Sequence, residues 1–363
     1  ILFAENPGIV IQVKDKYKEE VKKILEDAGI GYVKLGKPTE ERHILVEKGD
    51  ATYQFGIDYL RDVWYSTSYL LDRKQSMNGC AKKRFENYKK QPLEFVFDKS
   101  FTGKLSQFGL NPDRRTPTGI KAAIIREKGT NGEREMAYML YLAGFDVKDV
   151  TMTDLVSGRE TLEDINFIVF CGGFSNSDVL GSAKGWAGAF LFNPKAKAAL
   201  DNFYARKDTL SLGVCNGCQL MIELNLINPD FTKKAKMLHN DSHKFESKFV
   251  GVTVPMNRSV MFGSLSGSKL GIWVAHGEGK FSLPYHEDKY NVVLKYSYDE
   301  YPGNPNGSDY SIAGLASPDG RHLAMMPHLE RSCFPWQNAY YPADRILSLI
   351  HISEPTRHAQ ISY

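Results

Sequence analysis

Cys215 is the residue of this sequence whose type and setting most clearly allow chemistry. It lies in the segment Gly213-Val214-Cys215-Asn216-Gly217, between an apolar run at 209–214 and a helical pattern of apolar residues. Glycines on both sides of a cysteine at such a junction are typical of a nucleophile elbow, because the chain turns sharply there. The N-terminus of the helix then favours the thiolate, which is the reactive form. The alternative is a buried, inert cysteine at a strand end.

His328 and Glu330 could supply the rest of the chemistry that a cysteine nucleophile needs. They stand two residues apart in Met325-Met326-Pro327-His328-Leu329-Glu330-Arg331, so in an extended segment both side chains project to the same side. A histidine that takes the proton of a thiol needs a partner that fixes its tautomer and supports its positive charge. A nearby carboxylate can do both. A surface His-Glu pair without catalytic meaning is the alternative.

These motifs resemble the class I glutamine amidotransferase domain. More narrowly, they are similar to the glutaminase of the large, single-chain phosphoribosylformylglycinamidine synthase family. The resemblance runs from residue 1 to about Arg345. The segments that carry it are 213–219, 327–331, 171–178 (Cys-Gly-Gly-Phe-Ser-Asn-Ser-Asp), 275–281 (Ala-His-Gly-Glu-Gly-Lys-Phe) and 334–338 (Phe-Pro-Trp-Gln-Asn).

The resemblance implies a glutamine amidohydrolase in which Cys215, His328 and Glu330 form the triad. Cys215 would attack L-glutamine to give a glutamyl thioester, and the ammonia would serve the ATP-dependent conversion of formylglycinamide ribonucleotide to formylglycinamidine ribonucleotide in purine biosynthesis. The partner would be the synthetase domain of the same polypeptide. The full enzyme is expected to use ATP and Mg²⁺, whereas no cofactor is expected on this chain.

An attack on an amide also needs donors for the developing oxyanion. The backbone N–H groups of Gly173 and Asn216 are the candidates, since Asn216 follows the nucleophile and glycine permits close approach. An ordinary strand-to-helix turn is the alternative for Gly172 and Gly173.

Substrate-binding residues follow from the resemblance alone. Class I relatives hold glutamine with residues that match Gln219 and the 240–245 segment, here Ser242, His243 and Phe245. These residues could also be simple packing or turn residues. A second His-x-Glu, at His276 and Glu278, is assigned no catalytic role, because the family position of the triad is that of His328.

The elements that must position these residues predict an α/β fold. Short apolar strands at 122–125, 167–170 and 210–214 alternate with helices, which favours a mostly parallel, doubly wound sheet of flavodoxin-like type with its site at the carboxyl ends of the strands. Later segments (250–254, 271–275, 292–296) predict an antiparallel extension. Thr130 and Glu133 predict a capping box opening a helix over 134–143.

The predicted organisation has four parts. By resemblance, residues 1–57 are the α+β end of a synthetase domain, its second ATP-binding-like half, to which no nucleotide site is assigned. Residues 58–118 form a helical connector whose basic run Lys82-Lys83-Arg84 is expected on a solvated helix face. Residues 119–346 are the glutaminase domain. Residues 347–363 resemble a translated sequencing adapter and are predicted to be a non-native tail, so its histidines receive no functional weight.

Composition excludes several classes of protein. The 46 basic and 43 acidic residues give a net charge of +3, which calls for neither a nucleic acid nor an anionic membrane. No apolar stretch approaches a membrane span. The five cysteines form no disulfide framework, and Cys218 is expected to pack in the core. A working thiolate suits a reducing compartment, so a cytoplasmic location is predicted.

Two other functions stay open, a different elbow-cysteine hydrolase of similar fold and a non-catalytic docking module.

Overall fold

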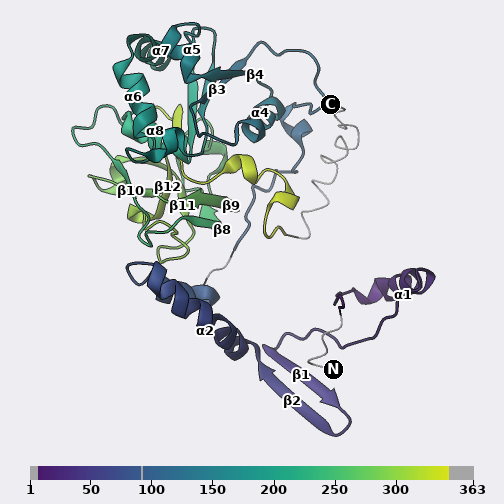
Figure 1. Cartoon of the computed structure of the whole chain (residues 1–363). Coiled ribbons are helices and arrows are strands. Elements are labelled where there is room, and N and C mark those ends of the chain that lie inside the picture. The colour runs from purple at the N-terminus through teal and green to yellow at the C-terminus, as the bar shows by residue number, and fades with distance from the viewer. Residues whose placement is uncertain (1–6, 91–92, 343–363) are drawn as a thin grey trace. The chain divides into compact units, whose positions relative to one another are not determined.

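The structure is a computed structural model that describes residues 7–90 and 93–342 (Figure 1). It divides into two compact units, residues 1–64 and the residues from 65 onward. The division falls within helix α2 (Ile57–Gln75), close to the predicted start of the connector. The predicted non-native tail at 347–363 lies outside the described residues.

The first unit consists of a helix and a hairpin. Helix α1 (Lys18–Asp27) is followed by β1 (His43–Lys48) and β2 (Ala51–Gly56), which pair antiparallel. Among its described residues none is buried. This unit therefore has no core of its own in the part of the chain that the structure describes.

The second unit is built on a nine-stranded sheet in the order β4-β3-β5-β6-β13-β12-β11-β8-β9. Its strands along the chain are β3 (Lys121–Arg126), β4 (Asp146–Thr151), β5 (Phe167–Phe170), β6 (Leu210–Val214), β8 (Glu246–Thr253), β9 (Lys269–His276), β11 (Asn291–Tyr296), β12 (Ile312–Ala316) and β13 (His322–Met325). A separate pair is formed by β7 (Lys236–Leu238) and β10 (Lys280–Ser282).

One half of this sheet is parallel and the other antiparallel. Strands β3, β4, β5, β6 and β13 pair in parallel, and numbered along the chain they lie in the order 2-1-3-4-5, which is the flavodoxin-like order. Strands β12, β11, β8 and β9 add the antiparallel extension. The predicted α/β fold is confirmed.

Helices cover both faces of the parallel half (Figure 1). On one face lie α5 (Met152–Ser157), α6 (Lys184–Phe192), α7 (Pro194–Ala205) and α8 (Asn216–Glu223), which contact one another. Helix α4 (Glu133–Leu142) packs on β3 and β4. The side chains of β5 between these layers are buried, in agreement with its continuous apolar sequence.

Two local predictions differ from the structure. The capping box at Thr130 and Glu133 is wrong: Gly132, with φ of 83°, caps α4, while the Thr130 hydroxyl donates to the carbonyl of Glu127. A left-handed N-cap position favours glycine, which has no side chain that could form a capping box. In α3 (Cys80–Glu86), Lys82 and Lys83 are exposed as expected, but Arg84 is half-buried and forms ion pairs.

Candidate active site

Cys215 stands at a strained turn between β6 and α8. Its backbone has φ of 53° and ψ of −105°, a conformation that few residues other than glycine adopt, and its N–H donates to the carbonyl of Met325. The two flanking glycines are required by close packing. A Cβ at Gly217 would lie 2.0 Å from the carbonyl oxygen of Phe170, and one at Gly213 would lie 2.5 Å from that of Gly217. The geometry is that of the predicted elbow.

The side chains of Cys215 and His328 converge over Gly172. A Cβ built on Gly172 would lie 2.9 Å from Cε1 of His328 and 3.4 Å from Cβ of Cys215. Both side chains are buried, and the thiol of Cys215 donates to the carbonyl of Ala275 at 3.4 Å. Nε2 of His328 has no hydrogen-bond partner among the described residues, so it is free to exchange a proton with a ligand bound beside the sulfur.

Glu330 lies behind His328. Its Oε1 is 2.6 Å from Nδ1 of the imidazole, and both side chains are buried. Burial pushes the pKa of His328 down, but the charge of the Cys215 thiolate, its hydrogen bonding and the Glu330 carboxylate together raise that pKa to about 10. The imidazole is therefore held as an imidazolium beside the sulfur.

Gly173 and Asn216, the predicted oxyanion donors, lie at the carboxyl ends of neighbouring strands. Gly173 has φ of 119°, and a Cβ there would lie 2.6 Å from the carbonyl oxygen of Gly129, so only glycine fits. Asn216 is the first residue of α8, where a backbone N–H has no partner within the helix. Its side-chain Oδ1 accepts from the N–H of Ser175, which ties the elbow to the loop that follows Gly173.

Gln219, a predicted substrate-binding residue, has both ends of its amide engaged. Its Oε1 accepts from Nδ2 of Asn216 at 2.9 Å, and its Nε2 donates to the carbonyl of Glu278 at 2.8 Å. In this structure the side chain joins α8 to the segment that follows β9.

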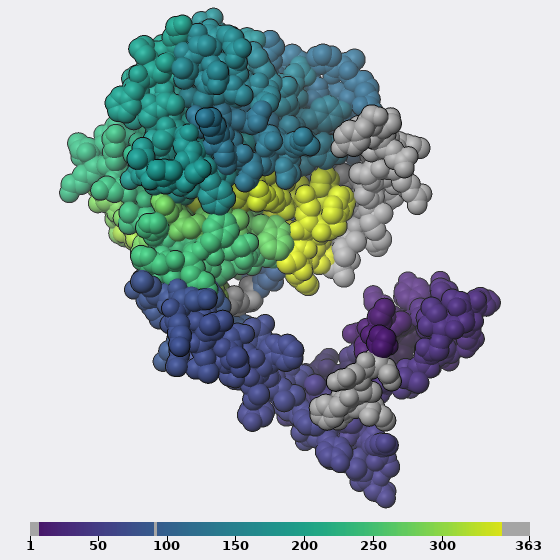
Figure 2. Space-filling model, viewed as in Figure 1, coloured from purple at the N-terminus to yellow at the C-terminus, as the bar shows by residue number. Residues whose placement is uncertain are grey.

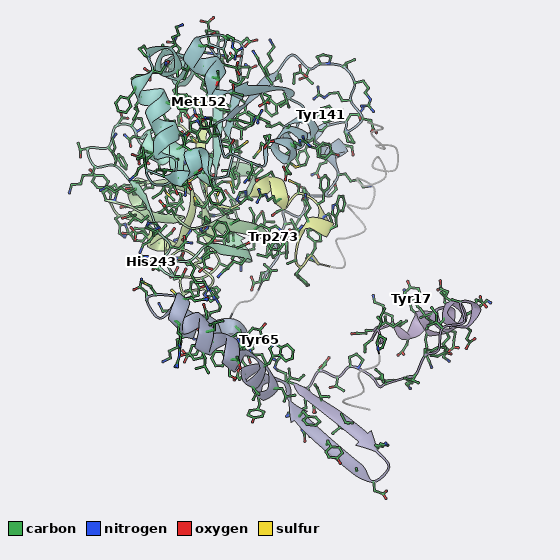
Figure 3. The ribbon with its side chains drawn as sticks, viewed as in Figure 1. Tyr17, Tyr65, Tyr141, Met152, His243 and Trp273 are labelled. Atoms are coloured by element: carbon green, nitrogen blue, oxygen red, sulfur yellow. The ribbon has the colours of Figure 1, made fainter. Side chains whose placement is uncertain are left out.

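Ser242, His243 and Phe245 occupy different environments. The hydroxyl of Ser242 is buried and donates to Glu246 Oε1. His243, labelled in Figure 3, has φ of 52° and stacks on the ring of His239 at 5.8 Å. The half-exposed ring of Phe245 lies 5.9 Å from that of Phe174, which follows Gly173.

His276 is buried beside the triad, and sequence reasoning missed the residue that orients it. Oδ1 of Asn240 faces Nδ1 of His276 at 3.1 Å and accepts from the N–H of Gly279, while its Nδ2 donates to the carbonyl of His276. Burial and the charge of His328 lower the pKa of His276 to about 3, so this ring stays neutral. No local pattern marks the contact of Asn240 with His276, because the two residues are 36 positions apart in the chain.

The remaining cysteines lack the setting of Cys215. Burial raises the pKa of the thiols of Cys80, Cys171, Cys218 and Cys333, the last to about 12. Cys218 is fully buried one helical turn after Cys215, as expected for a packing residue.

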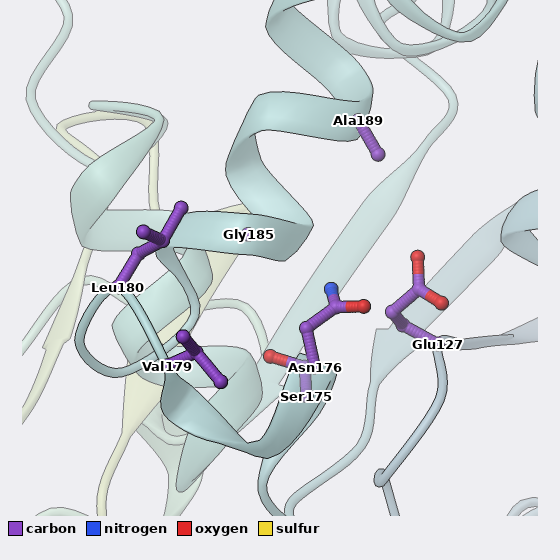
Figure 4. Close-up of a pocket in the computed structure, with 7 residues that line it drawn as sticks. All are labelled: Glu127, Ser175, Asn176, Val179, Leu180, Gly185 and Ala189. Atoms are coloured by element: carbon purple, nitrogen blue, oxygen red, sulfur yellow. The ribbon is translucent and has the colours of Figure 1, made fainter.

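A pocket opens beside the loop that follows Gly173 (Figure 4). It is lined by Glu127, Ser175, Asn176, Val179, Leu180, Gly185 and Ala189. None of the predicted catalytic residues lines it. Among the described residues no group of three or more His, Cys, Asp or Glu could hold a metal ion. In the same part of the chain, no helix has the length and apolar character to cross a membrane.

Comparison with known proteins places these features in a family. Residues 119–354 match the CobB/CobQ-like glutamine amidotransferase domain family. The chain is 38% identical over 367 residues to a probable phosphoribosylformylglycinamidine synthase, chloroplastic/mitochondrial, of Arabidopsis thaliana, covering 94% of this chain and 25% of that protein. It is also 38% identical over 377 residues to the phosphoribosylformylglycinamidine synthase of Homo sapiens, covering 94% of this chain and 28% of that protein.

The chain therefore spans about a quarter of the length of these curated relatives. Among solved structures, it is similar to that of PurLQS from Thermotoga maritima, with 27% sequence identity and a TM-score of 0.49. That likeness covers 65% of this chain and 99% of the other.

Proposed function

The chain belongs to the CobB/CobQ-like glutamine amidotransferase domain family, and we propose that it hydrolyses glutamine through Cys215, His328 and Glu330. One observation carries this proposal: Cys215 and His328 converge over Gly172 while Glu330 lies 2.6 Å from the far nitrogen of the imidazole. A thiolate, a proton carrier and an orienting carboxylate are thus in one buried site.

The reaction begins when the thiolate of Cys215 bonds to the side-chain carbonyl carbon of glutamine. The oxyanion that forms would accept from the backbone N–H groups of Gly173 and Asn216. His328 then gives its Nε2 proton to the amide nitrogen, the C–N bond breaks, and ammonia leaves a glutamyl thioester. A water molecule that gives a proton to His328 attacks the thioester, and its products are glutamate and the free thiolate.

Gln219, Ser242, His243 and Phe245 remain our candidates for the residues around bound glutamine. The support differs among them. His243 and Phe245 are exposed, and Phe245 lies against Phe174 of the loop that follows Gly173. Ser242 and Gln219 are buried and hydrogen-bonded to protein groups. We infer that the buried pair shapes the site and that the exposed pair is free to contact a ligand.

We further propose that the ammonia serves a synthetase domain of the same polypeptide, in the ATP-dependent conversion of formylglycinamide ribonucleotide to formylglycinamidine ribonucleotide. The relatives named phosphoribosylformylglycinamidine synthase support this role, since they match 94% of the chain. We assign ATP and Mg²⁺ to the rest of such an enzyme and not to this chain. We also propose a reducing compartment, the cytoplasm, because a catalytic thiolate and four further free cysteines would persist there.

Glutamate release from glutamine tests the glutaminase. We expect Cys215→Ala to abolish release, and Cys80→Ala, a matched change of a buried cysteine in α3, to leave it within about twofold of wild type. Circular dichroism of both variants checks the fold. Equal rates in the wild type and in folded Cys215→Ala would end the proposal.

A further inference from the structure

An ion network with a buried centre joins the connector to the segment beside the proposed active site. At its centre is Glu246, which is 2% exposed. Its Oε1 accepts from the hydroxyls of Ser242 and Tyr301, at 2.5 and 2.9 Å, and its Oε2 pairs with Nζ of Lys248 at 2.6 Å. A carboxylate this deeply buried is retained only when such partners surround it.

The connector supplies two members of this network. Asp72, near the end of α2, accepts from Nζ of Lys244 at 2.8 Å and from Arg84 of α3 at 2.6 Å. Arg84 also lies 3.4 Å from Oε1 of Glu246. We call Asp72, Arg84, Lys244 and Glu246 the clamp. In Figure 2 the blue surface that includes α3 adjoins the green surface within the second unit.

Two further hydrogen bonds attach the connector to the same short segment. The N–H of Met77 donates to the carbonyl of Ser242 at 3.0 Å, and Nδ2 of Asn78 donates to the carbonyl of Asp241 at 2.8 Å. The backbone at 240–245 belongs to no helix or strand, and His243 has a positive φ. Contacts from outside the segment add to its internal hydrogen bonds in holding one conformation.

Asn240 connects the clamped segment to the 275–279 segment, which lies beside Cys215. Its side chain donates to the carbonyls of Lys244 and His276 and accepts from the N–H of Gly279. The neighbouring carbonyl of Ala275 accepts from the Cys215 thiol. Three steps, from Asp72 to Lys244, to Asn240 and to the 275–279 segment, thus connect the connector with the nucleophile.

Stability alone does not account for the clamp. Burying the charge of Glu246 costs about as much free energy as pairing it returns, and the partly exposed pairs of Asp72 add little, so we explain the clamp by the conformation that it specifies. The clamp also stands at the end of α2, the helix whose first residues belong to the first unit. It fixes a segment that holds three of the proposed glutamine-binding residues and that contacts the 275–279 segment beside Cys215.

We propose that Asp72 is a positioning residue for glutamine binding: with Arg84 it holds the 240–246 segment, and through Asn240 the 275–279 segment, in the form that accepts the substrate. This inference rests on the proposed glutaminase function. In this proposal the connector affects the affinity of the site for glutamine, whereas the triad determines the reactivity of the Cys215 thiol.

A diazoketone analogue of glutamine, which alkylates a catalytic thiol, separates binding from chemistry without turnover. Mass spectrometry locates the label, and its concentration dependence gives KI and the maximal rate. We expect Asp72→Asn to raise KI about tenfold, the effect of losing one charge-assisted hydrogen bond, with the maximal rate changed less than about twofold. Iodoacetamide lacks the amino-acid group that the glutamine site would bind. It should therefore alkylate Cys215 at the same rate in Asp72→Asn as in the wild type.

A double-mutant cycle and a neighbouring charge provide the controls. Lys244→Met should also raise KI, and the double variant should be no worse than the more affected single variant, because both changes break one pair. Lys74→Met, which removes an exposed charge from the same helix, should leave KI unchanged.

The outcomes distinguish the two proposals. An unchanged KI in Asp72→Asn overturns the positioning role, as does a parallel fall in iodoacetamide reactivity and melting temperature, which would mean a general loss of structure. A wild-type chain that the analogue does not label at Cys215 contradicts the glutaminase function itself, and the positioning role with it.

Discussion

The carboxylate of Glu330 lies 2.6 Å from Nδ1 of His328, and each side chain is 2% exposed. The second oxygen of the carboxylate, Oε2, is buried without a partner among the described residues. Nε of Arg331 lies farther from the carboxylate than the imidazole does, at 3.7 Å from Oε1. The charge of Glu330 is therefore directed mainly at the imidazole.

We expect Glu330→Gln to lower kcat for glutamine hydrolysis roughly a hundredfold, because an amide neither supports the imidazolium nor fixes its tautomer as a carboxylate does. The raised pKa of His328, about 10, lets the wild type keep activity until the imidazolium loses its proton near that pH. Loss of the carboxylate should move this alkaline limb to lower pH. A pH–rate profile measures both effects, and an alkaline limb that stays in place would argue against Glu330 as the partner.

Cys215 should be the one thiol of the described chain that iodoacetamide modifies at pH 7. The thiols of Cys80, Cys171, Cys218 and Cys333 all have a pKa raised by burial, so few of them are thiolates at pH 7. Peptide mass mapping after a short exposure checks this selectivity, with Cys215→Ala as the control that takes up no label. Labelling of a second cysteine at a comparable rate would contradict the electrostatic account of the site.

Gly217→Ala should destabilise the fold by about 3 kcal/mol or more, because its Cβ would lie 2.0 Å from a backbone oxygen of β5, which the sheet holds in place. Gly188→Ala in α6 is the matched control. Its Cβ would meet only the ring of Phe192 at 3.8 Å, so it should be neutral or stabilise the helix by up to about 1 kcal/mol. Chemical denaturation compares the two variants. Equal stability would show that the elbow can relax around a methyl group.

Local sequence predicted most of the fold and the location of the elbow. The continuous apolar run of β5 follows from the burial of a parallel strand. The glycines beside Cys215 follow from the close approach of two backbones at the elbow. Both constraints act on residues that are neighbours in the sequence. The His328–Glu330 contact could be predicted for the same reason, since two residues at i and i+2 in extended chain share a side.

Contacts between distant segments could not be predicted in this way. Arg84 was expected on a solvated helix face because the charge balance of the surrounding sequence is near neutral, whereas its partner Glu246 is 162 residues away. Asn240 likewise acts on a histidine 36 residues downstream. Side chains of this kind satisfy buried polar groups across the fold, and a single asparagine or arginine carries no periodic signal of that role.

His322 should make the protein less stable in acid. Burial lowers the pKa of this histidine to about 4, and its Nδ1 is 2.9 Å from the hydroxyl of Ser211. Between pH 6.5 and 4 the unfolded chain binds a proton that the folded chain does not. The free energy of unfolding therefore decreases as the pH is lowered through that window, by about 3 kcal/mol at most from this residue. His322→Gln removes this titration, and its urea-unfolding free energy should therefore change less between pH 7 and pH 4.5 than that of wild type. His286→Gln, a change of an exposed histidine, should keep the wild-type dependence. If His322→Gln lost as much stability as wild type over this interval, the acid sensitivity would have to come from other groups.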